Sequence, residues 1–148
     1  MTNADTTGMV PVTITGVAVK QGDGPDRCER FSIMLESAAD GDSRRLLISV
    51  GDAEATALAL SLQGHEFPRP MTYQFMASLV GAAGSAVRSV RVTHQADGIF
   101  YAQVMLRGGT QVDARPSDAI NLAVVTGAQV FVASELLAHE ARPRERSF

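Results

Sequence analysis

Short runs in which apolar and polar residues alternate constrain this chain more than any other feature of its sequence. Alternation has the period of a β-strand, whose side chains point to opposite faces in turn. The first run changes phase at Gly16, which indicates a β-bulge, and its apolar residues are Val10, Val12, Ile14, Val17 and Val19. The sequence therefore predicts a bulged strand at the start of the fold.

Further runs predict an antiparallel sheet. The alternating runs span residues 31–35, 46–50, 87–94, 99–107 and 111–115. The pairs Asp97-Gly98 and Gly108-Gly109 separate the last three runs and are typical of hairpin turns. Residues 130–132 form a short apolar run, which predicts a buried strand.

Four segments carry helix signals. Residues 53–63 are rich in Ala and Leu and precede Gly64, which suits a left-handed C-terminal cap. Thr72, Ser117 and Ser134 are predicted to cap three later helices, because their hydroxyl oxygens accept bonds from backbone N–H groups. In the helix after Thr72 one stripe is predicted to pack in the core, through Phe75, Met76, Leu79, Val80 and Ala83.

The predicted order of elements is βββαα, βββα, βα. Runs of strands followed by helices favour an α+β fold over a parallel α/β sheet. A length of 148 residues with 45% hydrophobic residues suits one core, so we expect a single compact domain, mainly of antiparallel strands with three to four helices. We place this domain at residues 9–141, between a flexible N-terminal tail at 1–8 and a charged C-terminal tail at 142–148.

Charge and cysteine content limit the classes of function. A net charge of −3 and a pI of about 5.5 are unlike a protein that wraps nucleic acid with a basic surface, so any phosphate site must be local. Cys28 is the single cysteine, which excludes an internal disulfide. We expect a cytoplasmic protein with no membrane contact, because membrane-spanning and signal-peptide patterns are missing. No glycine-rich nucleotide loop or HExxH motif occurs, so no organic cofactor is evident.

A polar corner is predicted where the last hairpin meets the third helix. A three-residue loop that includes Thr110 keeps the apolar residues of the two strands together, namely Val104, Leu106, Val112 and Ala114. The opposite face then carries Tyr101, Gln103, Asp113 and Arg115. This polar face leads directly to the helix start at Ser117.

Two interpretations of this corner are open. Asp113 and Asp118 lie on either side of the junction and could share a divalent cation, Mg or Mn, as metal-assisted phosphodiester cleavage requires. Arg115 and the helix N-terminus at Ser117 would then hold a phosphate. In the structural alternative, Asp113 and Arg115 form an ordinary ion pair, Ser117 caps the helix and Asp118 favours its first turn.

Several segments resemble the successive motifs of the bifunctional nuclease (BFN) domain family. They follow one another between residues 46 and 137 as GDAEATALALSLQG, PRPMT, DGIFYAQVML, DARPSDAINLA and VFVASELL. The resemblance implies DNase and RNase activity, a compact α+β fold and self-association, for which a homodimer is the simplest form. Candidate catalytic residues that match the family pattern are Asp113, Asp118 and Glu54, the first two as metal ligands. Candidate substrate-binding residues are Arg69, Thr72, Tyr101, Arg115 and Ser117.

One departure from the family pattern bears on activity. Family members continue the PRPxT motif with His-Asp, whereas this chain has Tyr73 and Gln74. Histidine and aspartate form a natural acid/base or metal pair, and Tyr and Gln replace neither well. The sequence therefore predicts a weak nuclease. The alternatives are a repurposed scaffold that binds a small molecule or protein partner in a biosynthetic or stress pathway, and a purely structural oligomeric protein.

Overall fold

The computed structural model describes residues 8–21, 25, 29–141 and 143–144. Most of the two predicted tails, and Cys28, lie outside the described residues. The strands form one seven-stranded sheet of order β3-β2-β1-β7-β4-β5-β6, in which only β4 and β7 pair in parallel. Their bounds are β1 Met9–Gln21, β2 Glu29–Ser37, β3 Arg45–Val50, β4 Val87–Ala96, β5 Ile99–Leu106, β6 Gln111–Ala114 and β7 Gln129–Ala133. The predicted α+β fold is confirmed.

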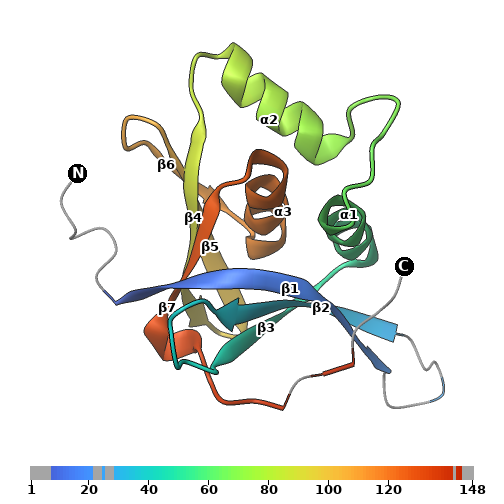
Figure 1. The fold of residues 1–148 in the computed structure, drawn as a ribbon, viewed down its shortest axis with the longest axis vertical. Coiled ribbons are helices and arrows are strands. Elements are labelled where there is room, and N and C mark those ends of the chain that lie inside the picture. Colours follow the sequence, from blue (N-terminus) through green and yellow to red (C-terminus); the bar gives the residue numbers. More distant parts are fainter. Residues whose placement is uncertain (1–7, 22–24, 26–28, 142, 145–148) are drawn as a thin grey trace.

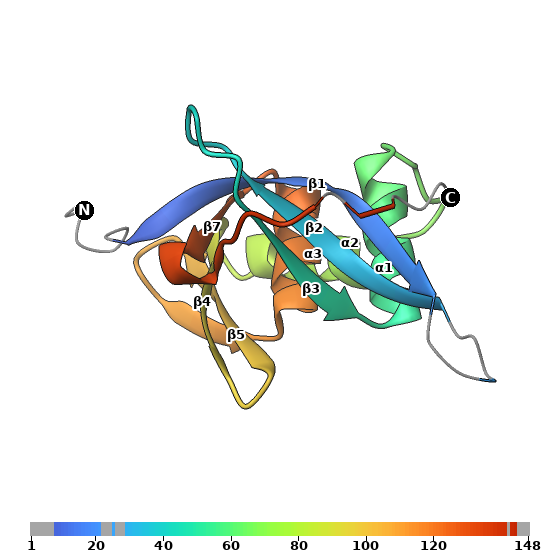
Figure 2. The ribbon, with the colours of Figure 1, turned by 90° about the horizontal axis from the view of Figure 1, so that it is seen from below.

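The described residues form three α-helices, α1 Asp52–Leu62, α2 Thr72–Ala82 and α3 Pro116–Thr126. Of these, α1 and α3 pack against the sheet and α2 packs mainly against α3. Figure 1 shows α3 near the middle of the molecule, with α1 beside it and α2 on the side away from β1. In Figure 2, which views the molecule from below, β1, β2 and β3 cross in front of the helices. Within the described residues no helix combines the length and the apolar character needed to cross a lipid bilayer.

The core lies between the sheet and the helices. Its fully buried side chains come from inner strands of the sheet and from α1 and α3, and include Ile33, Leu35, Leu58, Val90, Val92, Ile120, Val130 and Val132. The predicted bulge is confirmed, since the register between β1 and β2 shifts between Ile14 and Gly16. Each alternating run places one face in this core, which explains the period of two.

The predicted helix starts need correction. The N-cap residues are Met71 for α2 and Arg115 for α3, so Thr72 and Ser117 lie inside the helices. Pro116 takes the first position of α3, where its missing N–H is of no consequence. The predicted helix after Ser134 is wrong: Ser134–Leu136 forms only a 3-10 turn, η2, because Ala138 then pairs with Arg45 of β3 and draws the chain into extended form.

The predicted core stripe of α2 is also largely wrong. Phe75 and Leu79 are 59% and 58% exposed, and only Met76 and Val80 of the stripe are partly buried. The one buried residue of α2 is Tyr73. The helix packs mainly against α3, so most of its apolar surface has no covering element in the described chain.

The last hairpin has the predicted face but a different register. Val104 pairs with Val112 and Ala102 with Ala114, so the three-residue loop spans residues 107–109, whereas the prediction included Thr110. Val112 is 44% exposed instead of buried. The register differs from the predicted one because a hydrogen bond from the Leu106 N–H to the Thr110 carbonyl closes the loop before Thr110. Gly108 and Gly109 both have positive φ and permit this tight turn.

Candidate functional site

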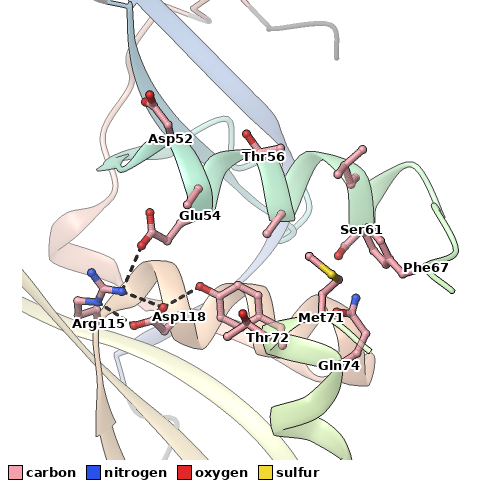
Figure 3. A pocket seen from close by; sticks show the side chains of 14 residues that line it. Asp52, Glu54, Thr56, Ser61, Phe67, Met71, Thr72, Gln74, Arg115 and Asp118 are labelled. Atoms are coloured by element: carbon pink, nitrogen blue, oxygen red, sulfur yellow. Dashed lines mark hydrogen bonds and ion pairs between the residues drawn. The ribbon is translucent and has the colours of Figure 1, made fainter. Parts of the chain in front are cut away.

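A cleft of about 570 Å³ opens between α1 and the start of α2, and the first turn of α3 closes one end of it. Figure 3 shows the charged residues at this closed end and Phe67 at the other. The lining residues are Asp52, Ala53, Glu54, Thr56, Ala57, Leu60, Ser61, Phe67, Met71, Thr72, Tyr73, Gln74, Arg115 and Asp118. The cleft therefore combines residues from three helix starts that are distant in sequence.

Four side chains form a connected network at the closed end. Arg115 donates from Nε to Asp118 Oδ2 at 2.7 Å and from Nη2 to Asp118 Oδ1 at 3.1 Å. The same Nη2 donates to Glu54 Oε1 at 3.3 Å. Tyr73 donates its hydroxyl proton to Asp118 Oδ1 at 2.7 Å (Figure 3). Asp118 thus joins the starts of α2 and α3, and Arg115 extends the network to α1.

The network fixes the protonation of Asp118, Tyr73 and Arg115. Burial would raise the pKa of Asp118, but hydrogen bonds from Arg115 and Tyr73 outweigh it and hold that pKa below its usual range. Burial, followed by the hydrogen bond to the Asp118 carboxylate and its charge, raises the pKa of Tyr73 well above its usual range. The bond to Asp118 raises the pKa of Arg115. At neutral pH the corner therefore holds an anionic Asp118, a neutral Tyr73 and a cationic Arg115.

Asn121 sets the spacing of α1 and α3. It is fully buried, and its Nδ2 donates to the Glu54 carbonyl at 3.2 Å and to the Ser117 carbonyl at 2.9 Å. The Ser117 side chain is only 8% exposed and does not line the cleft. Ser117 therefore contributes its backbone to the joint between helices, and Asn121 holds Glu54 and Arg115 on facing helices.

Some predicted site residues lie in or beside the cleft, and others lie elsewhere in the fold. Glu54, Thr72, Arg115 and Asp118 line the cleft together. Arg69 lines an adjoining hollow, which shares Phe67 and Gln74 with the cleft.

Tyr101 and Asp113 lie elsewhere. Tyr101 stacks on His94, with ring centroids 4.5 Å apart and planes 4° from parallel. Asp113 is exposed on β6 opposite Gln103, and its neighbour Ala114 is the residue that packs on the core. Because adjacent strand residues point to opposite faces, Tyr101 and Asp113 face away from α3.

The donor set does not fit the divalent cation expected of Asp113 and Asp118. Both oxygens of Asp118 already accept bonds from Arg115 or Tyr73, and Asp113 does not line the cleft. Across the described parts of the chain, no three His, Cys, Asp or Glu side chains are arranged to hold a metal ion. In this arrangement the corner is an ion-pair network in which Arg115 bonds to the carboxylates of both Asp118 and Glu54.

Sequence reasoning missed Tyr73 and Asn121 as members of this site. The family pattern presents Tyr73 only as a poor replacement for histidine, yet Tyr73 connects α2 to Asp118. The sequence signal for Tyr73 is a tyrosine in a helix that has no charged residues. The hydroxyl of a buried tyrosine needs a hydrogen-bond partner, which must then come from another element. For Asn121 the signal was an amide within an otherwise apolar helical run.

Comparison with known proteins places this geometry in context. A sequence model of the bifunctional nuclease domain matches residues 33–145. The uncharacterized protein Rv1829 of Mycobacterium tuberculosis is 35% identical over 130 residues, which cover 88% of this chain and 75% of that protein. Bifunctional nuclease 1 of Arabidopsis thaliana is 34% identical over 106 residues, and bifunctional nuclease 1 of Oryza sativa subsp. japonica is 32% identical over 104 residues. These cover 68% and 66% of this chain, but only 32% and 31% of the plant proteins.

Proposed function

The chain belongs to the bifunctional nuclease domain family, and on this premise we propose that it is a weak nuclease that cleaves phosphodiester bonds of DNA and RNA at the cleft between α1, α2 and α3. The observation that carries the proposal is the position of Arg115. Its guanidinium lies at the closed end of the cleft, where it is hydrogen-bonded to Asp118. The Arg115 side chain is nevertheless 67% exposed, so it can contact a ligand. A guanidinium fixed in this way presents planar donors to a phosphate.

The remaining donors of Arg115 support this role. Nε and Nη2 are engaged by Asp118 and Glu54, while no bond within the described part of the chain uses Nη1. The backbone of α3 begins at the same point, and a helix N-terminus favours anions. The plant relatives are named bifunctional nucleases, which accords with a phosphodiester as the ligand.

Slow chemistry follows from the protonation of the corner. A general acid or base works best with a pKa near the working pH. Asp118 is held as a carboxylate and Tyr73 as a phenol, so neither exchanges a proton readily near neutrality. Arg115 can stabilise charge on the phosphate, but neither Asp118 nor Tyr73 is poised to activate a nucleophile. We therefore expect cleavage well below that of an efficient nuclease.

The proposal is tested by assaying purified protein on labelled single-stranded DNA and RNA with magnesium, manganese or chelator. We expect slow cleavage that Arg115→Ala reduces by about tenfold or more, since a charge-assisted phosphate contact contributes about 1.5 to 3 kcal/mol. Arg30→Ala is the matched control, because Arg30 is exposed on β2 away from the cleft. Cleavage absent in every condition, or unchanged in Arg115→Ala, would contradict the proposal. The comparison of magnesium, manganese and chelator measures whether an added cation speeds cleavage.

A second candidate function is binding without cleavage, with a small molecule or a protein partner as the ligand. The Tyr73 hydroxyl on Asp118 favours it, because this bond occupies the carboxylate that would otherwise act on a substrate. Retained ligand binding by a protein that shows no cleavage would select this alternative.

A further inference from the structure

The two halves of the cleft differ in chemistry, and this difference indicates what part of a nucleic acid would fit. The closed end carries the charges of Glu54, Arg115 and Asp118. The other half contains no charged side chain and combines apolar residues, among them Phe67 and Met71, with the neutral polar groups of Ser61 and Gln74 (Figure 3). A nucleotide has the same division, since its phosphate is anionic and its base is a flat ring with an apolar face.

We propose that the cleft holds one unstacked nucleotide of a single strand, with the phosphate at Arg115 and the base between α1 and Phe67. The proposal rests on the proposed function of the same site and names its substrate class. It predicts preference for single-stranded over duplex nucleic acid. A duplex keeps its bases stacked inside, where they cannot enter a slot between two helices unless they are flipped out.

The wall formed by α1 leaves room for a ring. Ala53 and Ala57 lie one helical turn apart and both line the cleft, so their part of the α1 wall carries only methyl groups, with Thr56 and Leu60 beside it. Phe67 and Met71, from the segment that precedes α2, line the same cleft. Stacking of a base on an aromatic side chain is tolerant of base identity and contributes about 1 to 3 kcal/mol.

Polar groups at the border of this slot can reach the edge of a base. Thr56, Ser61 and Gln74 line the cleft and offer hydroxyl and amide groups that both donate and accept. The volume of about 570 Å³ lies within the range of about 300 to 1,000 Å³ that is usual for small-ligand sites. It suits a ligand of about nucleotide size and not a rod as wide as a duplex.

A phosphate bound at Nη1 of Arg115 gains a second donor if it also replaces one existing contact of the guanidinium. The Arg115 bond to Glu54, at 3.3 Å, is longer than its bonds to Asp118, at 2.7 and 3.1 Å. A phosphate oxygen is therefore expected to replace Glu54 on Nη2, while Asp118 keeps the guanidinium in place. Glu54 is then a competitor for the phosphate, and Glu54→Gln should increase affinity.

Fluorescence anisotropy with chelator present tests the inference by binding alone, with gels to confirm that the probe is intact. The probe is a labelled single-stranded oligothymidylate, compared with the same strand in a duplex and with an abasic strand of equal phosphate number. We expect affinity for the single strand to exceed that for the duplex and the abasic strand by about tenfold, because both lose the stacked base. We expect Glu54→Gln to increase affinity for the single strand about threefold or more, since it removes an opposing charge.

Two variants locate the base. Ala57→Leu fills the slot and should lower single-strand affinity by about tenfold, while Ala96→Leu at the exposed end of β4 should leave it unchanged. The second variant is Phe67→Ala, which removes the stacking surface without adding bulk. It should also lower the affinity for the single strand. Thermal unfolding of each variant separates loss of binding from loss of fold.

Equal affinity for the single, duplex and abasic strands would overturn the inference, whatever the variants do, since this comparison uses the unaltered protein. Unchanged affinity in both Ala57→Leu and Phe67→Ala would also overturn it. The inference and the proposed function fail separately. Base-dependent binding without cleavage would keep the nucleotide slot and reject the nuclease, and cleavage with no dependence on the base would do the reverse.

Discussion

Helices α2 and α3 have the same length of 11 residues and similarly apolar sequences, but they are used in opposite ways. Seven residues of α3 are buried, whereas Tyr73 alone is buried in α2. The reason is their position: α3 contacts the sheet and both other helices, while α2 lies outside α3 (Figure 1). Apolar periodicity therefore identifies the apolar face of a helix, but not whether another element covers it.

The first prediction compares core substitutions in the two helices. Ile120→Ala in α3 removes a fully buried side chain and is expected to destabilise the fold by about 2 to 5 kcal/mol. Leu79→Ala in α2 removes a side chain that is 58% exposed, and we expect a loss below about 1 kcal/mol. Urea unfolding measures both, at a concentration where light scattering finds monomers. Equal losses would mean that α2 is covered as fully as α3.

This contrast also marks what the sequence could and could not predict. Strand alternation is a local signal, so the strands, the bulge at Gly16 and the outward direction of Asp113 could be read from the sequence. The cleft depends on contacts between distant residues. Tyr73 and Asp118 are 45 positions apart, and Asn121 and Glu54 are 67 apart, so no local pattern could join them.

The same lesson applies to the corner that was expected to hold a metal. Asp113 and Asp118 are close in sequence, and this closeness suggested a shared cation. The pleat of β6 turns Asp113 away from α3, whereas Glu54, which is distant in sequence, lies opposite Arg115. Ala114 shows the direction of Asp113. Neighbouring residues of a strand point to opposite faces, so Asp113 faces outward because Ala114 packs on the core.

The second prediction concerns what covers α2. We propose that a second copy of the chain does, in a homodimer whose interface includes Phe75 and Leu79, which lie one helical turn apart and are both exposed. The helix itself contains no charged residue, so two copies can meet there without burying like charges. The expected mass is about twice 15.7 kDa by light scattering.

Disruption of the α2 face tests this dimer. Leu79→Glu should weaken dimerisation by about 30-fold or more, as expected of an interface residue worth about 2 kcal/mol. Gln95→Glu adds the same charge at an exposed position of β4 and should leave the dimer intact. Analytical ultracentrifugation of both variants gives the dissociation constants. A wild-type protein that stays at 15.7 kDa over a wide concentration range would rule out the dimer.

The third prediction concerns the side-chain hydrogen bond that joins α2 to α3. Tyr73→Phe keeps the buried ring but removes the hydroxyl that donates to Asp118, and we expect a loss of about 0.5 to 1.5 kcal/mol. Tyr101→Phe is the matched control, because Tyr101 is 38% exposed and lies outside the cleft. Thermal unfolding compares the two. If Tyr73→Phe were as stable as the wild type, packing alone would hold α2.

The smallest expected effect is the pH dependence that Asp118 gives to the joint of α2 and α3. Its folded pKa lies below its usual value, so its contribution to stability is present above the ordinary aspartate pKa of about 3.9 and is lost as the pH falls through the folded pKa. The effect is modest because Arg115 is largely exposed to solvent. Asp118→Asn should therefore flatten the decline of the unfolding free energy below about pH 4, while Asp113→Asn, outside the network, should leave the Asp118 contribution in place. Urea unfolding of both variants across the acid range measures this difference, and parallel curves for Asp118→Asn and the wild type would show that the carboxylate does not stabilise the joint.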